Sequence, residues 1–209
     1  MKQKEHWERV YSTKPSNTVS WFQENPEMSL QLIQSTGIPL TSSIIDVGGG
    51  ASVLVDTLLQ KGYTNLTVLD LSASALDTAR KRLDLHTNKV KWLEADITNA
   101  TLPVHAYDLW HDRAVFHFLT STADRRAYID TTLRSVKPGS HVIIATFAED
   151  GPTTCSGLPV MRYSANELYA EFGKSFSLVK CEKEEHYTPL GGVQNFVYCH
   201  FQIKRVSVD

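Results

Sequence analysis

The stretch Ser43-Ile44-Ile45-Asp46-Val47-Gly48-Gly49-Gly50-Ala51-Ser52 decides how this chain folds. Its apolar residues lead into an aspartate and three consecutive glycines. A helical pattern of apolar residues opens directly afterwards at Val53, Leu54, Leu58 and Leu59. We therefore predict a buried strand, a tight turn and a helix. Glycines let the backbone approach a ligand closely, and the first turn of a helix presents unpaired N–H groups. Such a turn at the carboxyl end of a strand is typical of a nucleotide site.

The order of residues in this turn narrows the class of nucleotide. The dinucleotide fingerprint G-x-G-x-x-G requires glycine at position 53, where the chain has Val53. The triphosphate cradle G-x-x-x-x-G-K-[ST] does not occur in the sequence. What remains is D-x-G-x-G, with Ser52 at a position where a further glycine is frequent. This pattern favours a ligand that is neither a dinucleotide nor a triphosphate.

Composition and charge exclude several classes of protein. Hydrophobic residues make up 42% of the 209 residues and charged residues 21%, as is usual for one soluble globular domain. The net charge of -2 gives no reason to expect nucleic acid or an anionic membrane as a partner. No apolar run is long enough to span a bilayer, and the first residues lack the apolar core of a secretion signal. Cys155, Cys181 and Cys199 form no CxxC pair, which favours a reducing cytoplasm and argues against a zinc site or a disulfide framework.

Upstream of the glycine turn, residues 5–35 form an aromatic-rich extension. Trp7 and Tyr11 lie on one face of a predicted helix, Trp21 and Phe22 follow a polar loop, and a second helix begins after Pro26. Two interpretations stand side by side. The aromatic residues cap one end of the sheet, or as a group they form a lid that keeps water out of a pocket.

Downstream, strands and helices alternate. We predict strands at residues 66–70, 90–96, 107–111 and 141–147, and helices at residues 72–83 and 123–136. A loop over 149–159 and a helix over 164–172 lead to an antiparallel ribbon of strands at 176–187 and 194–204. Together these elements predict a three-layer α/β domain whose sheet contains one antiparallel strand.

Three carboxylates end three successive strands: Asp46, Asp70 and Asp96. The carboxyl ends of parallel strands meet at one edge of the sheet, where ligands bind. Asp70 comes twenty residues after Gly50, close to the spacing at which an acidic residue accepts hydrogen bonds from ribose hydroxyls. One such aspartate alone is more typical of a helix cap or a turn, but three in phase with three strands favour a ligand site.

In these motifs the chain resembles the class I S-adenosylmethionine-dependent methyltransferases. The resemblance runs from about residue 44 to residue 146 through residues 46–50, 68–72, 94–97 and 107–113, and it includes the turn at 136–140. It implies a three-layer Rossmann-like sheet of order 3-2-1-4-5-7-6 with strand 7 antiparallel. We expect a single domain over 1–209, with an aromatic cover at 1–40, a cofactor-binding half at 41–147 and an acceptor-side part at 148–209.

The resemblance implies S-adenosylmethionine as cofactor, S-adenosylhomocysteine as product, and no metal. The glycines would pass under the methionine part, Asp46 would lie near its amino group, Asp70 would hold the ribose, and Asp96 would accept from the adenine. The implied cofactor contacts are Asp46, Gly48, Gly49, Gly50, Asp70, Leu71, Ser72, Asp96, Ile97 and His111. The N-terminal segment is similar to the aromatic cover of thiopurine-type methyltransferases and of small lysine methyltransferases, which adds Trp7, Tyr11 and Trp21.

The acceptor side leaves more alternatives open. The chain lacks the [DN]PP[YFW] motif of enzymes that methylate exocyclic base or amide nitrogens. His111 is either a general base or a cofactor contact, and Arg113 either holds an acidic acceptor or pairs with Asp112. We take His111 and Arg113 as catalytic candidates. The candidates for substrate contact are Trp21, Phe22, Arg113, His117, Arg162 and Tyr163, although His117, Arg162 and Tyr163 also suit plain packing or loop roles.

Three functions follow from the sequence. The first is methyl transfer to a small molecule by in-line displacement, which needs alignment and exclusion of water but no covalent nucleophile. The second is methylation of protein lysine on the same fold. The third is a non-catalytic module that binds an adenosine ligand.

Overall fold

The computed structural model describes residues 2–205, so the outermost residues of the expected domain, 1 and 206–209, lie outside the described part. The helices are α1 Lys2–Thr13, α2 Glu27–Ser35, α3 Leu54–Gln60, α4 Ala73–Leu83, α5 Thr122–Ser135 and α6 Ala165–Phe172, with short 3-10 turns η1 Ser16–Thr18, η2 Asp84–Lys89 and η3 Phe116–Phe118. The strands are β1 Ser43–Val47, β2 Asn65–Asp70, β3 Val90–Glu94, β4 Tyr107–Arg113, β5 Val136–Phe147, β6 Thr154–Cys155, β7 Leu158–Pro159, β8 Phe176–Tyr187 and β9 Val193–Ile203.

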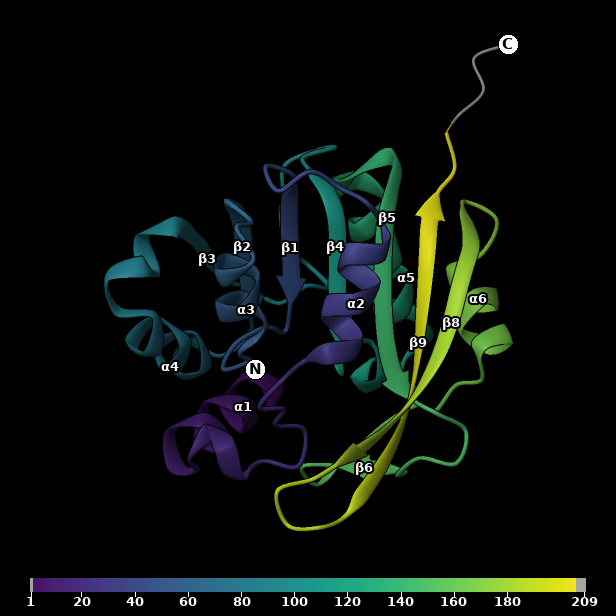
Figure 1. Cartoon of the computed structure of the whole chain (residues 1–209). Helices are drawn as coiled ribbons and strands as arrows, with labels where there is room; N and C mark the ends of the chain where they lie inside the picture. The colour runs from purple at the N-terminus through teal and green to yellow at the C-terminus, as the bar shows by residue number, and fades with distance from the viewer. Residues whose placement is uncertain (1, 206–209) are drawn as a thin grey trace.

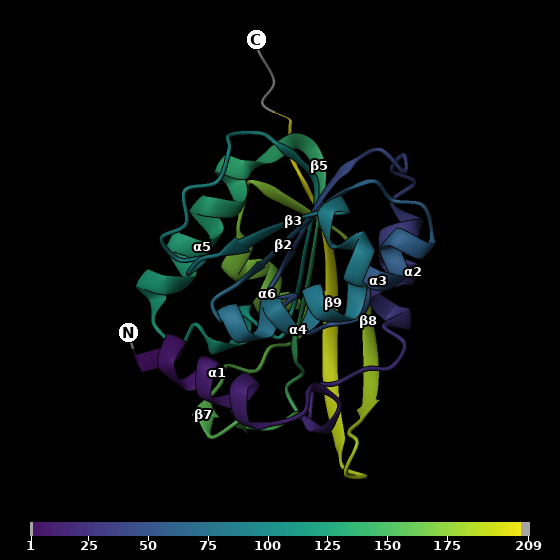
Figure 2. The ribbon, with the colours of Figure 1, turned by 90° about the vertical axis from the view of Figure 1, so that its left-hand side faces the viewer.

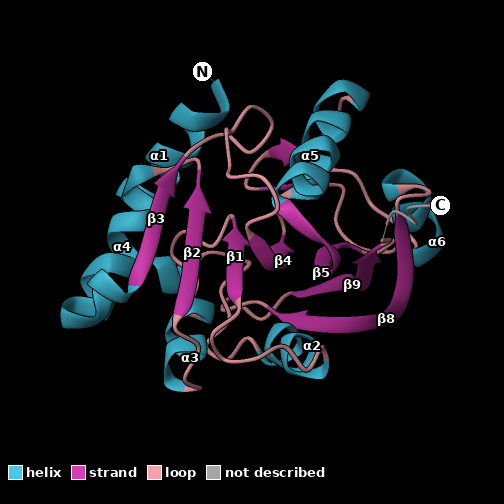
Figure 3. Ribbon diagram, turned by 90° about the horizontal axis from the view of Figure 1, so that it is seen from above, coloured by secondary structure: helices cyan, strands magenta, loops and turns pink. Residues whose placement is uncertain are grey.

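The predicted sheet topology is confirmed. The seven-stranded sheet has the order β3-β2-β1-β4-β5-β9-β8 (Figure 3), which is the expected 3-2-1-4-5-7-6 once the small β6–β7 hairpin is set aside. Strand β9 runs antiparallel to both β5 and β8, whereas the other pairings in the sheet are parallel. The C-terminal ribbon predicted from alternating residues thus supplies the single antiparallel member.

Successive side chains of the central strands point to opposite faces of the sheet and belong to two separate hydrophobic cores. Ile45 and Val47 of β1 join the core under α5 and α6, whereas Ile44 joins the core under α2, α3 and α4. Figure 2 shows these two helical layers on opposite sides of the sheet. The strands are apolar on both faces because both faces are covered.

Two helix starts form as predicted. The Ser72 hydroxyl accepts a hydrogen bond from the Ala75 amide at the start of α4. Ser164 and Glu167 form a reciprocal capping box at the start of α6. Capping of this kind satisfies amide groups that have no partner within the helix.

Several boundaries differ from the prediction. Strand β3 ends at Glu94, two residues before Asp96, and β4 continues to Arg113. Strand β5 begins at Val136 rather than at His141, because the pairing with β4 jumps from Val136 to His141 and the residues between them bulge out. The segment 149–159, predicted as loop, contains the β6–β7 hairpin.

Helix α1 lies across the carboxyl ends of the parallel strands. Figure 1 shows it below the arrowhead of β1, on the side to which the β8–β9 ribbon also extends. Its neighbour in the fold is α4. The N-terminal extension therefore covers the edge at which the strand-end carboxylates gather.

A buried hydrogen-bond chain joins β4 to α5. The Tyr128 hydroxyl donates to Asp112 at 2.6 Å and accepts from the Trp110 indole at 2.8 Å. All three side chains are buried. Burial raises the pKa of Asp112 to about 7, against the opposing effect of its hydrogen bond from Tyr128.

We predict that Tyr128→Phe lowers the free energy of unfolding by about 2 kcal/mol, because it leaves a buried carboxylate and a buried indole N–H each short of one partner. Urea denaturation of both proteins measures the difference. Tyr163→Phe is the matched control, since the buried Tyr163 hydroxyl has no hydrogen-bond partner within residues 2–205; its expected cost is below about 0.5 kcal/mol. Equal losses in the two variants would contradict the assignment.

Candidate functional site

The glycine turn after β1 packs tightly against its neighbours. The Gly48 amide donates to the Leu69 carbonyl at 2.7 Å. Gly48 has a φ of +72°, and a Cβ built there would come within 2.0 Å of the Val115 side chain. Both the backbone conformation and the lack of space require glycine at this position.

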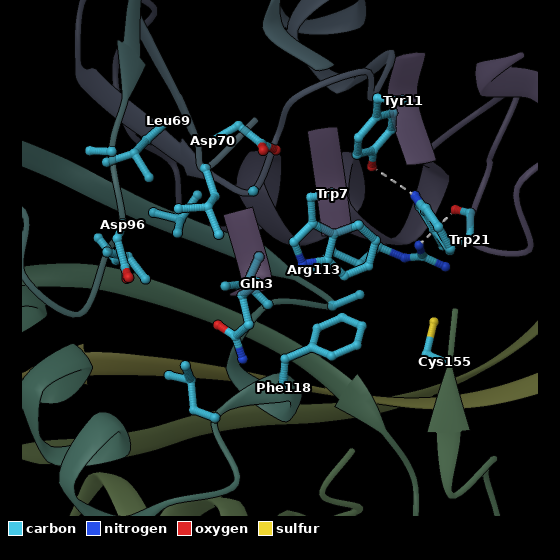
Figure 4. A pocket seen from close by; sticks show the side chains of 18 residues that line it. Gln3, Trp7, Tyr11, Trp21, Leu69, Asp70, Asp96, Arg113, Phe118 and Cys155 are labelled. Atoms are coloured by element: carbon cyan, nitrogen blue, oxygen red, sulfur yellow. Dashed lines mark hydrogen bonds between the residues drawn. The ribbon is translucent and has the colours of Figure 1, made fainter. Parts of the chain in front are cut away.

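A first cavity, here called the strand-end cavity, opens where β1, β2 and β4 end. Figure 4 shows Asp70 and Asp96 on one side of it, and Trp7, Tyr11 and Trp21 on the other. The strand-end cavity is lined by Gln3, Trp7, Tyr11, Trp21, Val47, Gly48, Leu69, Asp70, Leu71, Ala95, Asp96, Ile97, Arg113, Ala114, Val115, Phe118, Leu119 and Cys155.

Asp70 is a buried carboxylate on the wall of this cavity. Its Oδ1 accepts from the Ser72 amide at 2.8 Å. Burial raises the pKa of Asp70 to about 7; the nearby charge of Asp46 adds to this rise, while backbone amides of Ser72, Gly50 and Leu71 oppose it. Asp70 is therefore a strong acceptor that carries its full charge only above neutral pH.

A second cavity, the glycine-turn cavity, continues from the first on the other side of Gly48. Asp46, Gly49, Ser29, Phe22 and His111 line it, and it shares Tyr11, Trp21, Gly48 and Arg113 with the strand-end cavity. His111 bridges two groups, with Nδ1 at 2.7 Å from Asp46 Oδ1 and Nε2 at 2.9 Å from the Ser29 hydroxyl. The other carboxylate oxygen, Asp46 Oδ2, is buried and has no hydrogen-bond partner within residues 2–205.

Arg113 is fixed at the junction of the two cavities. Its guanidinium donates to the Tyr198 hydroxyl at 2.8 Å, to the Trp21 carbonyl at 3.1 Å and to Glu184 at 3.4 Å. It also lies 4.2 Å from the centre of the Phe196 ring.

The suggested ion pair between Arg113 and Asp112 is wrong. Consecutive residues of a strand point to opposite faces, and both residues belong to β4. Asp112 instead accepts from the amides of Val115 and Phe116 at 2.9 and 3.1 Å. Its carboxylate thereby holds the loop that lines the strand-end cavity.

The aromatic residues of the N-terminal extension form one packed group over the cavities. Trp7 meets Trp21 and Phe118 edge to face at ring-centre distances of 5.6 and 5.1 Å. The Trp21 indole donates to the Tyr11 hydroxyl at 3.1 Å. The aromatic residues therefore support one another as a group of rings, an arrangement that agrees with both the capping and the lid interpretation.

Polar contacts fasten α1 to three other segments. Glu8 accepts from the amides of Ala73 and Ser74, which places its carboxylate at the N-terminal end of α4. Lys4 pairs with Glu94 of β3. His6 lies 3.3 Å from the Ser156 hydroxyl in the turn between β6 and β7.

Comparison with known proteins agrees with this geometry. A family model described as a methyltransferase domain matches residues 44–139. EEF1A lysine methyltransferase 2 of Homo sapiens is 23% identical over 191 residues, which cover 85% of this chain and 75% of that protein. The N-methyltransferase NodS of Bradyrhizobium japonicum WM9, solved with S-adenosylhomocysteine, superposes with a TM-score of 0.70 at 18% identity over 95% of this chain and 98% of NodS. These matches identify the protein as an S-adenosylmethionine-dependent methyltransferase. A protein solved in work on the conversion of a disulfide bond into a thioacetal group during echinomycin biosynthesis has the same fold, with a TM-score of 0.78 and 18% identity over 99% of this chain and 94% of that chain.

The two cavities of this methyltransferase suit S-adenosylmethionine. The cofactor carries a nucleoside at one end and a zwitterionic amino acid at the other. Asp70 and Asp96 offer acceptors in the strand-end cavity. Asp46 Oδ2, which is buried and has no partner among the described residues, offers an acceptor for a cation in the glycine-turn cavity. Within residues 2–205, no group of three or more metal-ligating side chains occurs, and no helix is long and apolar enough to cross a membrane.

Several residues predicted for the site lie outside the lining of both cavities. Ser72 is turned to the start of α4, where it acts as the cap. Gly50 lies behind Asp70: a Cβ there would come within 2.4 Å of Asp70 Oδ2. Gly50 therefore gives Asp70 its space and does not itself face the cavities.

The acceptor-side candidates His117, Arg162 and Tyr163 also lie away from the cavities. His117 is fully buried, accepts from the Phe147 amide at 3.2 Å, and has its pKa lowered to about 3 by burial. Tyr163 packs in the core 5.9 Å from Phe116, and Arg162 donates to the Gly151 carbonyl. The structure therefore agrees with packing roles for His117 and Tyr163 and with a loop role for Arg162.

Sequence reasoning missed Gln3, Ser29 and Phe118. Only Ser29 carries a signal that makes it detectable. It lies three and four positions before Leu32 and Ile33, on the buried stripe of α2, where a polar side chain needs a partner. Gln3 and Phe118 line the strand-end cavity because of where α1 and η3 lie in the fold. No local sequence pattern predicts these positions.

The raised pKa of Asp70 predicts that cofactor affinity depends on pH. Ribose hydroxyls donate to an ionised carboxylate, so binding selects the deprotonated form, which declines below a pKa of about 7. We expect S-adenosylhomocysteine to bind about tenfold more weakly at pH 6 than at pH 8. Isothermal titration calorimetry across this range measures the effect. Asp70→Asn, which cannot titrate, should bind weakly with a flatter profile; a variant as pH-dependent as the parent would refute the role of Asp70.

Proposed function

We propose that this methyltransferase transfers the methyl group of S-adenosylmethionine to a small-molecule acceptor and leaves S-adenosylhomocysteine. The observation that carries the proposal is the junction of the two cavities at Tyr11, Trp21, Gly48 and Arg113. A cofactor with its nucleoside in one cavity and its amino acid in the other would have its sulfonium at this junction. The acceptor would then approach the methyl group from the side of the aromatic cover.

Each part of the cofactor is assigned to side chains of suitable chemistry. Asp96, with Leu71 and Ile97 alongside, is assigned to adenine, and Asp70 to the ribose hydroxyls. Asp46 is assigned to the ammonium group. The turn residues Gly48 and Gly49 would pass beneath the methionine part, and Trp7, Tyr11 and Trp21 would cover the bound molecule.

The chain's own residues contribute alignment and exclusion of water to the transfer. When bound, S-adenosylmethionine would supply a methyl group on a sulfonium, whose carbon–sulfur bond breaks toward sulfur as a lone pair of the acceptor bonds to the methyl carbon in line. The rings of Trp7, Trp21 and Phe118 exclude water from the junction, which strengthens electrostatic interactions there. Cys155 adds a buried thiol, whose pKa is raised to about 11 by burial and which therefore stays protonated and apolar at neutral pH.

The enclosure of the junction supports an acceptor of limited size. Tyr11 of α1 and Trp21 line the junction itself, and the β6 residue Cys155 lines the strand-end cavity beside it. Of the acceptor-side candidates, Trp21, Phe22 and Arg113 line the glycine-turn cavity. Three of the five N–H donors of Arg113 are already engaged, so Arg113 would hold the acceptor through its remaining donors and by its place at the junction.

A cytoplasmic location, expected from the cysteine usage, stays a prediction.

Methylation of protein lysine is the second candidate. EEF1A lysine methyltransferase 2 matches 85% of this chain. An open groove beside Phe22 also carries the carboxylates of Glu24, Glu27, Glu184 and Glu185. A cationic segment of a protein would be attracted to such a groove, because charges of one sign raise the local concentration of the opposite sign.

We expect the methyl label to appear in low-mass products. The enzyme is incubated with methyl-labelled S-adenosylmethionine and a lysate divided into a small-molecule fraction and a protein fraction. Label in the small-molecule fraction supports the first candidate, and label confined to protein supports lysine methylation. Asp70→Ala, which removes the assigned ribose contact, is the control and should abolish either signal. A parent enzyme that labels neither fraction although it binds the cofactor would contradict both candidates.

A further inference from the structure

Ser29, His111 and Asp46 form a buried hydrogen-bonded row on the wall of the glycine-turn cavity. Their exposed fractions are 1%, 2% and 4%. The row draws on three separate elements, since Ser29 belongs to α2, His111 to β4 and Asp46 to β1. Asp46 and His111 lie side by side in the sheet, as partners in the register of β1 and β4.

The chemistry of the three groups fixes the direction of the hydrogen bonds. An ionised carboxylate only accepts, so His111 Nδ1 carries the proton that lies between His111 and Asp46 Oδ1. For a neutral imidazole with its proton on Nδ1, Nε2 is the acceptor and the Ser29 hydroxyl donates to it. Removal of the Ser29 hydroxyl would leave Nε2 without this contact, so that the ring would be held only by its hydrogen bond to Asp46.

The row leaves one carboxylate oxygen of Asp46 available. Asp46 Oδ2 has no hydrogen-bond partner within residues 2–205. It lies against the glycine turn, where a Cβ on Gly49 would come within 2.3 Å of it. His111 thus holds one oxygen, and the other lies against Gly49 on the wall of the glycine-turn cavity.

We propose that Ser29 and His111 are positioning residues, which lock Asp46 in the orientation that binds the α-ammonium group of the cofactor. This inference rests on the proposed function, because it concerns the amino-acid end of the same cofactor. His111 thereby acts as a fixed donor to Asp46, with both ring nitrogens engaged, and not as the base that deprotonates the acceptor. Ser29 acts through His111 and confers selectivity for ligands that carry an amino acid.

A serine, a histidine and an aspartate in a row also occur in hydrolases, but this row lacks what hydrolysis requires. The attacking serine of a triad needs an open approach and donors for an oxyanion. Ser29 is 1% exposed on an α-helix between Met28 and Leu30. The row is therefore built to hold a charge in place.

Two adenosine ligands test the proposal. S-adenosylhomocysteine carries the ammonium group, and 5′-methylthioadenosine has the same nucleoside and sulfur without the amino acid. In Ser29→Ala we expect the Kd for S-adenosylhomocysteine to rise about tenfold, because the charged ammonium group of the ligand loses about one hydrogen bond to Asp46. The Kd for methylthioadenosine should stay within about twofold. Calorimetric titration of both ligands gives the two values, and binding of methylthioadenosine also reports that the variant is folded.

Matched variants complete the experiment. Ser35→Ala removes another serine of α2, whose hydroxyl bonds, among the described residues, only to the Leu32 carbonyl of the same helix, and should leave both Kd values unchanged. His111→Phe, which keeps the ring but removes both nitrogens, should show the same selective loss with a larger magnitude, and it decides the matter if Ser29→Ala does not fold.

Two outcomes overturn the inference: equal weakening of both ligands, which indicates a structural role alone, or no weakening of S-adenosylhomocysteine in either variant. Failure of the parent protein to bind S-adenosylhomocysteine would instead overturn the proposed function.

Discussion

Asp46, Asp70 and Asp112 are buried where β1, β2 and β4 end, and within residues 2–205 no lysine or arginine pairs with any of them. Burying a carboxylate without a cation is costly unless hydrogen bonds replace its water. The replacements here come mainly from the loops themselves. Asp70 takes the Ser72 amide, Asp112 takes the amides of Val115 and Phe116, and Asp46 takes the imidazole of His111. The need to satisfy these carboxylates therefore fixes the loops that form the cavities.

The glycine turn follows from the same constraint. Two of the carboxylates come so close to it that side chains on its residues would collide with them: a Cβ on Gly49 with Asp46 Oδ2 at 2.3 Å, and one on Gly50 with Asp70 Oδ2 at 2.4 Å. The absence of side chains at these glycines therefore leaves room for the buried aspartates as well as for the ligand. The run of three glycines next to Asp46 is explained by the packing of charge at the sheet edge, in addition to the approach of a cofactor.

The sequence predicted the parts of this structure that depend on local pattern. The strands β1 to β5, the β8–β9 ribbon and the caps at Ser72 and Ser164 follow from periodicity and turn chemistry. The strand order follows from the family resemblance. The partners of Arg113 could not be predicted, because Glu184 and Tyr198 lie more than seventy residues away and meet it only through the pairing of β5, β9 and β8. The ion pair of Asp112 with Arg113 was suggested because the strand was predicted to end at residue 111. Strand β4 continues to Arg113, and consecutive residues of a strand face opposite sides of the sheet. The row from Ser29 to Asp46 needs the docking of α2 on the sheet, which no pattern in either segment encodes.

The cofactor side and the acceptor side of the site differ in how they are held. Asp46, Asp70 and Gly48 belong to the sheet or to turns anchored by it, so their geometry is tied to the hydrogen bonds of the fold. The acceptor side proposed above consists of α1, the segment with Trp21 and the β6–β7 hairpin. These segments contact one another and η3 through rings and side chains, such as Trp7 with Phe118 and His6 with Ser156. Changes in these covering segments alter the walls of the junction without disturbing the buried carboxylates. A fold built in this way keeps one methyl donor while its acceptor varies, which is why the acceptor is the property that the family resemblance determines least.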